Sequence, residues 1–271
     1  MKSLLLFLIA SLLITEIHAQ TAPVYALPDA FNFDYTLTQT VTGNRTGDSA
    51  FFHFYYTRSG EYAAAEWSKN ENRKGNLLIV LTRAGNVIVF NRREKQISIL
   101  NPHKLMTDMM GMLKWIRMDS LMAHLRMNPD HPEFHSTKSG KTKTIGSYTS
   151  TEYAVTGPKQ TGSVWIANVD FLVQSDYFMN MLGTAMMSMM GNRAMSDKMS
   201  THPLMQAMMQ PKALVTDMEM SDSAGNRKLS LHTVSLLASS TNISTQGFGV
   251  NDYSNMSLSE IFEAEMKRRN N

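Results

Sequence analysis

The chain has 271 residues, 43% of them hydrophobic, and a net charge of +3 from 26 basic and 23 acidic side chains. A chain of this length can bury a core without covalent cross-links, and the absence of cysteine excludes disulfides and thiol catalysis. The positive excess is small and scattered, apart from residues 267–269, so the composition does not indicate nucleic-acid binding.

The first residues have the pattern of a secretory signal peptide. Lys2 precedes an apolar run over residues 4–14, and the small residue Ala19 follows it. The run is shorter than the ~20 residues that a membrane-spanning helix needs, so we expect cleavage after Ala19. No cysteine follows that could carry a lipid. The sequence therefore predicts a signal peptide over residues 1–19 and a periplasmic or secreted protein with no transmembrane segment after cleavage.

Much of the remaining chain is patterned as β-strands. Residues 31–42 alternate between apolar and polar side chains, as in a half-buried strand. Short β-prone segments with intervening turns follow, which is typical of an antiparallel meander. The predicted strands cover residues 31–42, 51–57, 62–67, 77–81, 87–90, 96–100, 142–145, 148–155, 163–167, 213–220 and 228–239. We expect the main anchors of the core to include Phe33, Tyr35, Phe52, Phe54, Trp67, Tyr148, Tyr153 and Trp165.

Methionine marks the segments that we expect to be helical. Most of the 23 Met residues lie within residues 105–127 and 175–209. A last helix is predicted to begin with a capping box formed by Ser257 and Glu260. The predicted helices cover residues 105–127, 175–190, 203–209 and 258–268. Because no linker or internal repeat divides the chain, we expect a single α+β domain over residues 20–271, with helices segregated from a large antiparallel sheet.

One segment resembles a known family. Residues 144–153 read Thr-Ile-Gly-Ser-Tyr-Thr-Ser-Thr-Glu-Tyr, and Trp165 follows in a strand. Tyr148, Tyr153 and Trp165 resemble the pattern of a family of secreted bacterial proteins of unknown function, family 4412, although two serines stand where that family has Gly and Cys. The resemblance implies a LolA/LolB-like architecture: a large curved antiparallel sheet, or half-barrel, with Met-rich helices packed in or over its concave face. It implies no reaction.

The second Met-rich segment predicts a binding role. Residues 177–190 are apolar on nearly every side of a helix, so they must contact another helix, a lipid-like ligand or a partner protein. Methionine suits such adaptable apolar contacts. We therefore predict an exported envelope protein that binds an apolar ligand or an envelope protein. The candidate ligand-binding residues are Met109, Met112, Tyr177, Phe178, Met181, Met186, Met187 and Met190.

The alternative prediction is a copper-binding periplasmic protein, because thioethers are soft ligands that suit Cu(I). Its candidate ligands are Met186, Met187, Met189, Met190, His202 and Met205.

No motif indicates catalysis. Residues 130–135 contain two His and two carboxylates, but Pro132 prevents a regular helical spacing of zinc ligands, so we expect a polar loop. Residues 157–163 resemble a phosphate-binding loop superficially, but they join two predicted strands and are interpreted as a hairpin turn. The Gly-x-Ser-x-Gly nucleophile motif is missing. The sequence therefore predicts a non-enzymatic protein without catalytic residues or cofactors.

Overall fold

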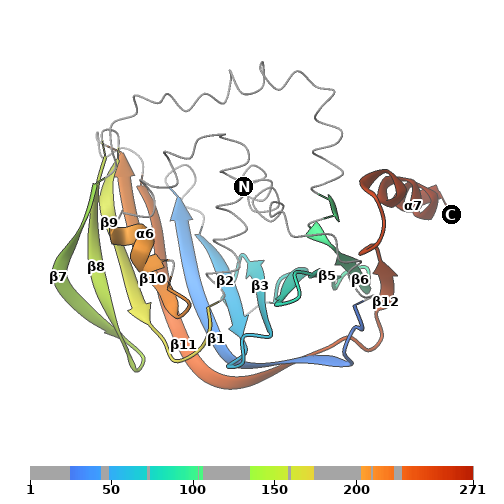
Figure 1. The fold of residues 1–271 in the computed structure, drawn as a ribbon, viewed down its shortest axis with the longest axis horizontal. Helices are drawn as coiled ribbons and strands as arrows, with labels where there is room; N and C mark the ends of the chain where they lie inside the picture. Colours follow the sequence, from blue (N-terminus) through green and yellow to red (C-terminus); the bar gives the residue numbers. More distant parts are fainter. Residues whose placement is uncertain are drawn as a thin grey trace, which may run out of the picture.

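The computed structural model describes residues 25–43, 49–71, 74–102, 104–105, 135–157, 160–173, 203–208, 210–222 and 228–270, most of which belong to one curved sheet (Figure 1). The strands are β1 (Ala30–Gly43), β2 (Ser49–Tyr56), β3 (Tyr62–Ser68), β4 (Leu77–Thr82), β5 (Val87–Asn91), β6 (Gln96–Leu100), β7 (His135–Ile145), β8 (Tyr148–Thr156), β9 (Gln160–Asn168), β10 (Ala213–Asp222), β11 (Lys228–Ser244) and β12 (Gly249–Asp252). The helices with described bounds are α6 (Pro203–Met208) and α7 (Leu258–Asn270).

The twelve strands have the order β12-β6-β5-β4-β3-β2-β1-β11-β10-β9-β8-β7. Strands β2 to β6 form the meander that the sequence predicts, and every neighbouring pair is antiparallel except β12, which runs parallel to β6. The pairing of β1 with β11 joins the N-terminal strands to the second half of the sheet. Contacts distant in sequence therefore hold the two halves together.

Strands β1 and β11 turn a corner in the middle of the sheet. The pairing of β1 with β2 begins at Tyr35, so the start of β1 projects beyond β2 while it stays paired with β11. A register shift in the β1–β11 pairing lies between Phe33 and Tyr35, as expected where a bulge bends a strand. Phe31 and Phe33 belong to one hydrophobic cluster, whereas Tyr35 and Leu37 belong to another. The bent pair thus supplies core residues to both halves of the sheet.

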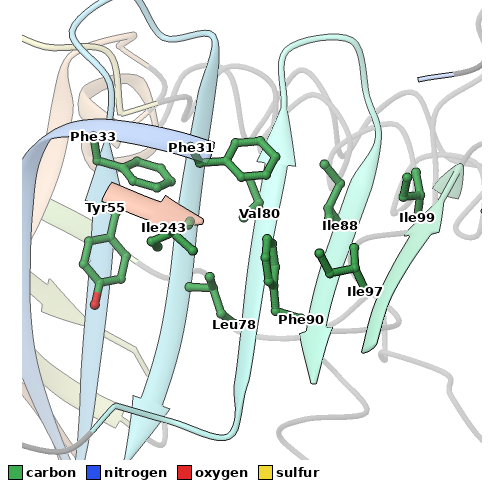
Figure 2. Packing of buried hydrophobic residues seen from close by; sticks show 11 residues of the cluster. Phe31, Phe33, Tyr55, Leu78, Val80, Ile88, Phe90, Ile97, Ile99 and Ile243 are labelled. Carbon is green, nitrogen blue, oxygen red and sulfur yellow. The ribbon is translucent and has the colours of Figure 1, made fainter. Parts of the chain in front are cut away.

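The first cluster, called the β2–β6 cluster here, lies between the meander and the bent end of β1 and β11 (Figure 2). Its buried members are Phe31, Phe33, Tyr55, Ala64, Leu78, Val80, Ile88, Phe90, Ile97, Ile99 and Ile243. The ring of Phe31 lies edge-on to Phe90, with 6.0 Å between centroids. The hydroxyl of Tyr62 accepts a hydrogen bond from the backbone N–H of Asn32 at 3.0 Å and donates to its carbonyl at 3.1 Å. Tyr62 thereby fixes the bent end of β1 over the meander.

Two further clusters lie in the other half of the sheet. In one of them, Phe171 stacks on Tyr35 with 4.2 Å between ring centroids and is fully buried with Leu37 and Ala167. In the other, Leu204 of α6 packs on Val164 and Ile166 of β9. Because side chains alternate along a strand, α6 covers the opposite side of β9 from Trp165.

The prediction of an α+β half-barrel with Met-rich helices in or over its concave face is wrong. The structure is nearly all strand and forms one open sheet, and within the described ranges no helix packs on a concave face. One side of the meander is instead covered by the sheet itself, through Phe31, Phe33 and Ile243 of the bent strands. The long predicted helices over residues 105–127 and 175–190 lie almost entirely outside the described residues.

The predictions of the individual strands are confirmed. Each predicted strand is present, and the capping box is confirmed, since Glu260 accepts hydrogen bonds from the backbone and hydroxyl of Ser257. The expected hairpin over residues 157–163 is confirmed by the pairing of β8 with β9. Of the predicted core aromatics, Phe33 and Tyr35 are buried. The remaining six, Phe52, Phe54, Trp67, Tyr148, Tyr153 and Trp165, are only half-buried.

The β2–β6 cluster predicts where stability is most sensitive to mutation. Phe90 is 1% exposed at the centre of this cluster, so Phe90→Ala should lower the free energy of unfolding by roughly 3–5 kcal/mol. Leu237→Ala is the matched control, because Leu237 is 56% exposed and should lose less than about 1 kcal/mol. Urea denaturation of both variants measures the difference, and equal losses would contradict the assignment of Phe90 to the core.

Candidate binding site

The meander is apolar on both of its sides, but the two sides are buried to different extents. The first side carries the β2–β6 cluster, and its residues in β4, β5 and β6 are fully buried. On the second side, strand registers align Phe54, Ala65, Ile79 and Val89 in one row across β2, β3, β4 and β5. A neighbouring row pairs Phe52 with Trp67. Both rows are half-buried.

We call this second side the half-buried face and define it by its large apolar side chains. These are Phe52, Phe54, Trp67, Leu77, Ile79, Leu81, Val87, Val89 and Leu100, of which only Val87 is buried. The rings of Phe52 and Phe54 are stacked with 6.2 Å between centroids, and Trp67 is the cross-strand neighbour of Phe52. In the described structure, the hydrophobic cluster around Ile79 and Val89 contains only residues of β4, β5 and β6, whereas Phe54 also packs against the cluster that contains Phe171. A sheet that is apolar on both sides normally has both sides covered, which makes the half-buried face the candidate binding site.

A polar cluster lies next to one end of this face, beside Tyr56. The carboxylate of Asp170 accepts hydrogen bonds from the hydroxyls of Tyr148 and, at 3.3 Å, of Tyr35. The guanidinium of Arg58 donates to the Tyr35 hydroxyl at 3.1 Å and lies over its ring. Phe171 links the cluster to Tyr56, with 5.1 Å between ring centroids. The end of the apolar face therefore carries exposed groups of both charges.

These contacts also demonstrate the curvature of the sheet. Tyr35 is in β1 and Tyr148 is in β8, and three strands lie between them in the sheet order. In a flat sheet this separation would be about 19 Å, because neighbouring strands lie ~4.8 Å apart. The ring of Phe171 nevertheless lies 4.2 Å from the Tyr35 ring and 6.4 Å from the Tyr148 ring between centroids, so the two tyrosines are drawn together across the curved sheet (Figure 1). This side of the β8–β11 region is concave.

The hydrogen bonds change the ionisation of the Asp170 cluster. The bond from Tyr148 is the largest cause that lowers the pKa of Asp170, and Tyr35 and Arg58 act in the same direction. Desolvation and, next, the bond to Asp170 raise the pKa of Tyr148 to about 12. The stable form is therefore a neutral phenol that donates to a charged carboxylate. The cluster is suited to contact a polar group, and it lacks a base with a pKa near neutrality.

A second polar network lies on the first side of the meander and is structural. Glu66 is fully buried, forms an ion pair with Arg92 and accepts hydrogen bonds from the Tyr55 hydroxyl and from the backbone N–H of Gly75, the latter at 2.9 Å. Burial and the bond to Glu66 raise the pKa of Tyr55. A Cβ atom at Gly75 would lie 2.3 Å from the carbonyl oxygen of Trp67, so only glycine fits there. Removing one member of such a buried ion pair lowers the stability by more than the intact pair contributes, because the other charge stays buried without a partner.

Two of the three residues that carry the family resemblance lie on the concave side, and the third lies opposite. Tyr148 binds Asp170. Trp165 is covered by Lys143, whose ammonium lies 4.4 Å from the ring centroid and 2.7 Å from the carboxylate of Asp217. Tyr153 instead packs against the cluster that contains Leu204. The three residues therefore make contacts on both sides of the sheet near β8 and β9.

The structure does not place the site residues that the sequence predicts. The candidate ligand-binding residues and the first five copper candidates lie outside the described residues, namely Met109, Met112, Tyr177, Phe178, Met181, Met186, Met187, Met189, Met190 and His202. Met205 lies in α6, and its side chain is not described. In the part of the chain that is described, no group of three His, Asp or Glu side chains could hold a metal ion. His135, from the excluded zinc pattern, begins strand β7.

The sequence does not predict the half-buried face, because aromatic residues in strands such as β2 and β3 are also typical of a buried core. The signal was present in the sequence, since residues 77–81 and 87–90 are apolar without alternation. Such runs are typical of strands with two apolar sides. Which side is covered depends on the bend of β1 and β11, and that is not visible in the sequence.

Neither a protein-family model nor a curated protein matches the chain, so membership of family 4412 is not confirmed. Several solved structures show a remote similarity to this chain. An uncharacterized conserved protein from Thermus thermophilus shows 7% identity and a TM-score of 0.35, with 80% of this chain and 89% of that one covered. A putative outer membrane lipoprotein-sorting protein domain from Vibrio parahaemolyticus shows 7% identity and a TM-score of 0.26, with 80% and 87% covered.

A third similar structure is MucB in complex with MucA(peri), with 7% identity, a TM-score of 0.31, and 76% of this chain and 50% of that one covered. At these identities and TM-scores the likenesses do not indicate a function. None of the described helices is both long enough and apolar enough to span a membrane.

The Asp170 cluster predicts an unusual alkaline titration. Tyr148 should titrate near pH 12 instead of its ordinary value of 10.0. Because the pKa is raised in the folded state, the stability that the neutral phenol contributes is present below pH 10 and is lost as the pH rises towards 12. The absorbance at 295 nm, taken as the difference between the native protein and Tyr148→Phe, measures this titration. Asp170→Asn should shift it downwards, and a difference titration centred near pH 10 in the native protein would contradict the proposed bond.

Proposed function

We propose that this protein is exported to the periplasm or the extracellular space and binds an apolar, lipid-like molecule on the half-buried face, without catalysing a reaction. The proposal treats residues 20–271 as one domain that remains after cleavage of the signal peptide. One observation carries it: β4 and β5 are apolar on both sides, and on the second side their hydrophobic cluster contains only residues of β4, β5 and β6.

The shape and chemistry of the half-buried face suit a flexible apolar chain. Its side chains are aliphatic in β4, β5 and β6 and aromatic in β2 and β3, and the aligned rows contain no charged group beside Ile79 or Val89. Each methylene that moves from water to such a surface contributes about 0.8 kcal/mol. A chain of about ten carbons can therefore supply several kcal/mol of binding energy, after the cost of association is subtracted.

The surroundings of the face suit a molecule with a polar end. Arg58 and Asp170 are exposed beside Tyr56, which lies two residues from Phe54 along β2 on the same side of the sheet. An amphiphile that lies along the half-buried face would keep its polar end hydrated next to these groups. The Met-rich segments would complete the site by adding adaptable apolar contacts, and the residues proposed for this role are Met109, Met112, Tyr177, Phe178, Met181, Met186, Met187 and Met190.

A binding experiment with two variants tests the proposal. Ile79→Ser and Val89→Ser each place a hydroxyl in the centre of the half-buried face and should weaken the binding of dodecanoate about tenfold, which corresponds to roughly 1.4 kcal/mol. Leu237→Ser is the matched control, since Leu237 is 56% exposed on β11, and it should bind as the native protein does. Calorimetric titration gives the affinities, and thermal melting confirms that each variant is folded.

The outcomes separate the proposal from its alternatives. Equal affinity in all three variants and the native protein would show that dodecanoate does not bind on this face. Native mass spectrometry of protein purified from its own host adds a direct measurement, since a co-purified lipid supports the proposal. A stoichiometric copper ion would favour the Met-based copper site, and a co-purified protein would favour a partner.

A further inference from the structure

Helix α7 exposes two large apolar side chains that the rest of the described structure leaves uncovered. Phe262 is 64% exposed and Met266 is 67% exposed. They are four residues apart, so they lie on the same side of the helix, one turn from each other. Figure 1 shows α7 beyond β12, at the end of the sheet. The capping box at Ser257 and Glu260 fixes the start of the helix, so this apolar stripe belongs to an ordered element.

The charges of α7 are divided between its two halves. Its first eight residues contain three acidic side chains, Glu260, Glu263 and Glu265, and no basic one. Residues 267–269 are all basic. The helix is therefore close to neutral as a whole but has an acidic half and a basic end. Two such helices repel each other when they are parallel and attract each other when they are antiparallel, because the acidic half of each then faces the basic end of the other.

We propose that α7 is a self-association surface, on which a second copy of this chain docks its own α7 in the antiparallel direction. An antiparallel helix pair has twofold symmetry, so both copies use the same surface and the contact closes at the dimer. Phe262 and Met266 of each copy form its apolar centre.

The charge pattern favours a second copy over a lipid surface. Amphipathic helices that lie on membranes carry an excess of basic residues, because cellular membranes are negatively charged. In α7 the acidic half would be repelled as strongly as the basic end is attracted. The expected contact is small for a protein interface, which places it among weak associations with dissociation constants in roughly the micromolar range.

Charge reversal gives a specific test. In one variant, Glu263→Lys and Glu265→Lys leave the capping Glu260 in place and give the helix an excess of positive charge. In a second variant, Lys267→Glu and Arg269→Glu give it an excess of negative charge. Sedimentation velocity of the full chain, from about 5 to 500 μM, measures self-association. We expect the native protein to form a dimer over this range and each variant alone to lose at least about tenfold in affinity. An equimolar mixture of the two variants should recover the dimer, and so should a chain that carries all four changes.

Each outcome either supports or overturns the proposed dimer. A native protein that stays monomeric throughout overturns it, as does a dimer that survives in both variants alone, because that dimer would use another surface. Phe262→Ser with Met266→Ser is the matched test of the apolar centre, and it should dissociate the dimer without lowering the melting temperature of the monomer. Vesicles of phosphatidylcholine and phosphatidylglycerol provide the remaining comparison, since tight binding of a monomeric native protein to them would assign α7 to a lipid surface instead.

Discussion

The bend in the paired strands β1 and β11 is the constraint on which the rest of the structure depends. Phe31 and Phe33 lie before the bend and complete the β2–β6 cluster, whereas Tyr35 and Leu37 lie after it and pack with Phe171 and Ala167. A single strand pair therefore contributes to two cores. Without the bend, the meander would expose apolar side chains on both of its sides, and each would cost stability in proportion to its area.

The same bend explains why the two sides of the meander differ. The strand ends can cover only one side, and they carry Ile243 and Phe31 to the side that contains Val80 and Phe90. The opposite side keeps Phe52, Phe54 and Trp67 half-buried, as expected for a surface that contacts a ligand or a further layer. The buried core and the candidate binding site thus both depend on the meander, because its strands carry apolar side chains on each side.

The sequence predicted the strands well because alternation and turn residues are local signals, as residues 31–42 and the β8–β9 hairpin illustrate. The sequence could not predict which side of each strand packs against other parts of the chain. Strand β12 has only four residues and forms because β6 offers a free edge. The burial of Glu66 could not be predicted either, because it depends on contacts with Gly75 and Arg92, which belong to the segments after β3 and β5. The predicted site did not include the half-buried face, because its aromatic residues are equally typical of a buried core, whereas the methionines lie in other segments.

The most direct test of the half-buried face is contact between Trp67 and a bound acyl chain. One variant keeps Trp67 and has the other two tryptophans replaced by phenylalanine, so its fluorescence reports on this face. A second variant keeps only Trp165, so its fluorescence reports on the concave side near β9. Bromine quenches tryptophan fluorescence at short range. Brominated dodecanoate should quench Trp67 strongly and saturably and leave Trp165 nearly unchanged. Saturable quenching of Trp165 alone, or of neither tryptophan, would contradict the account.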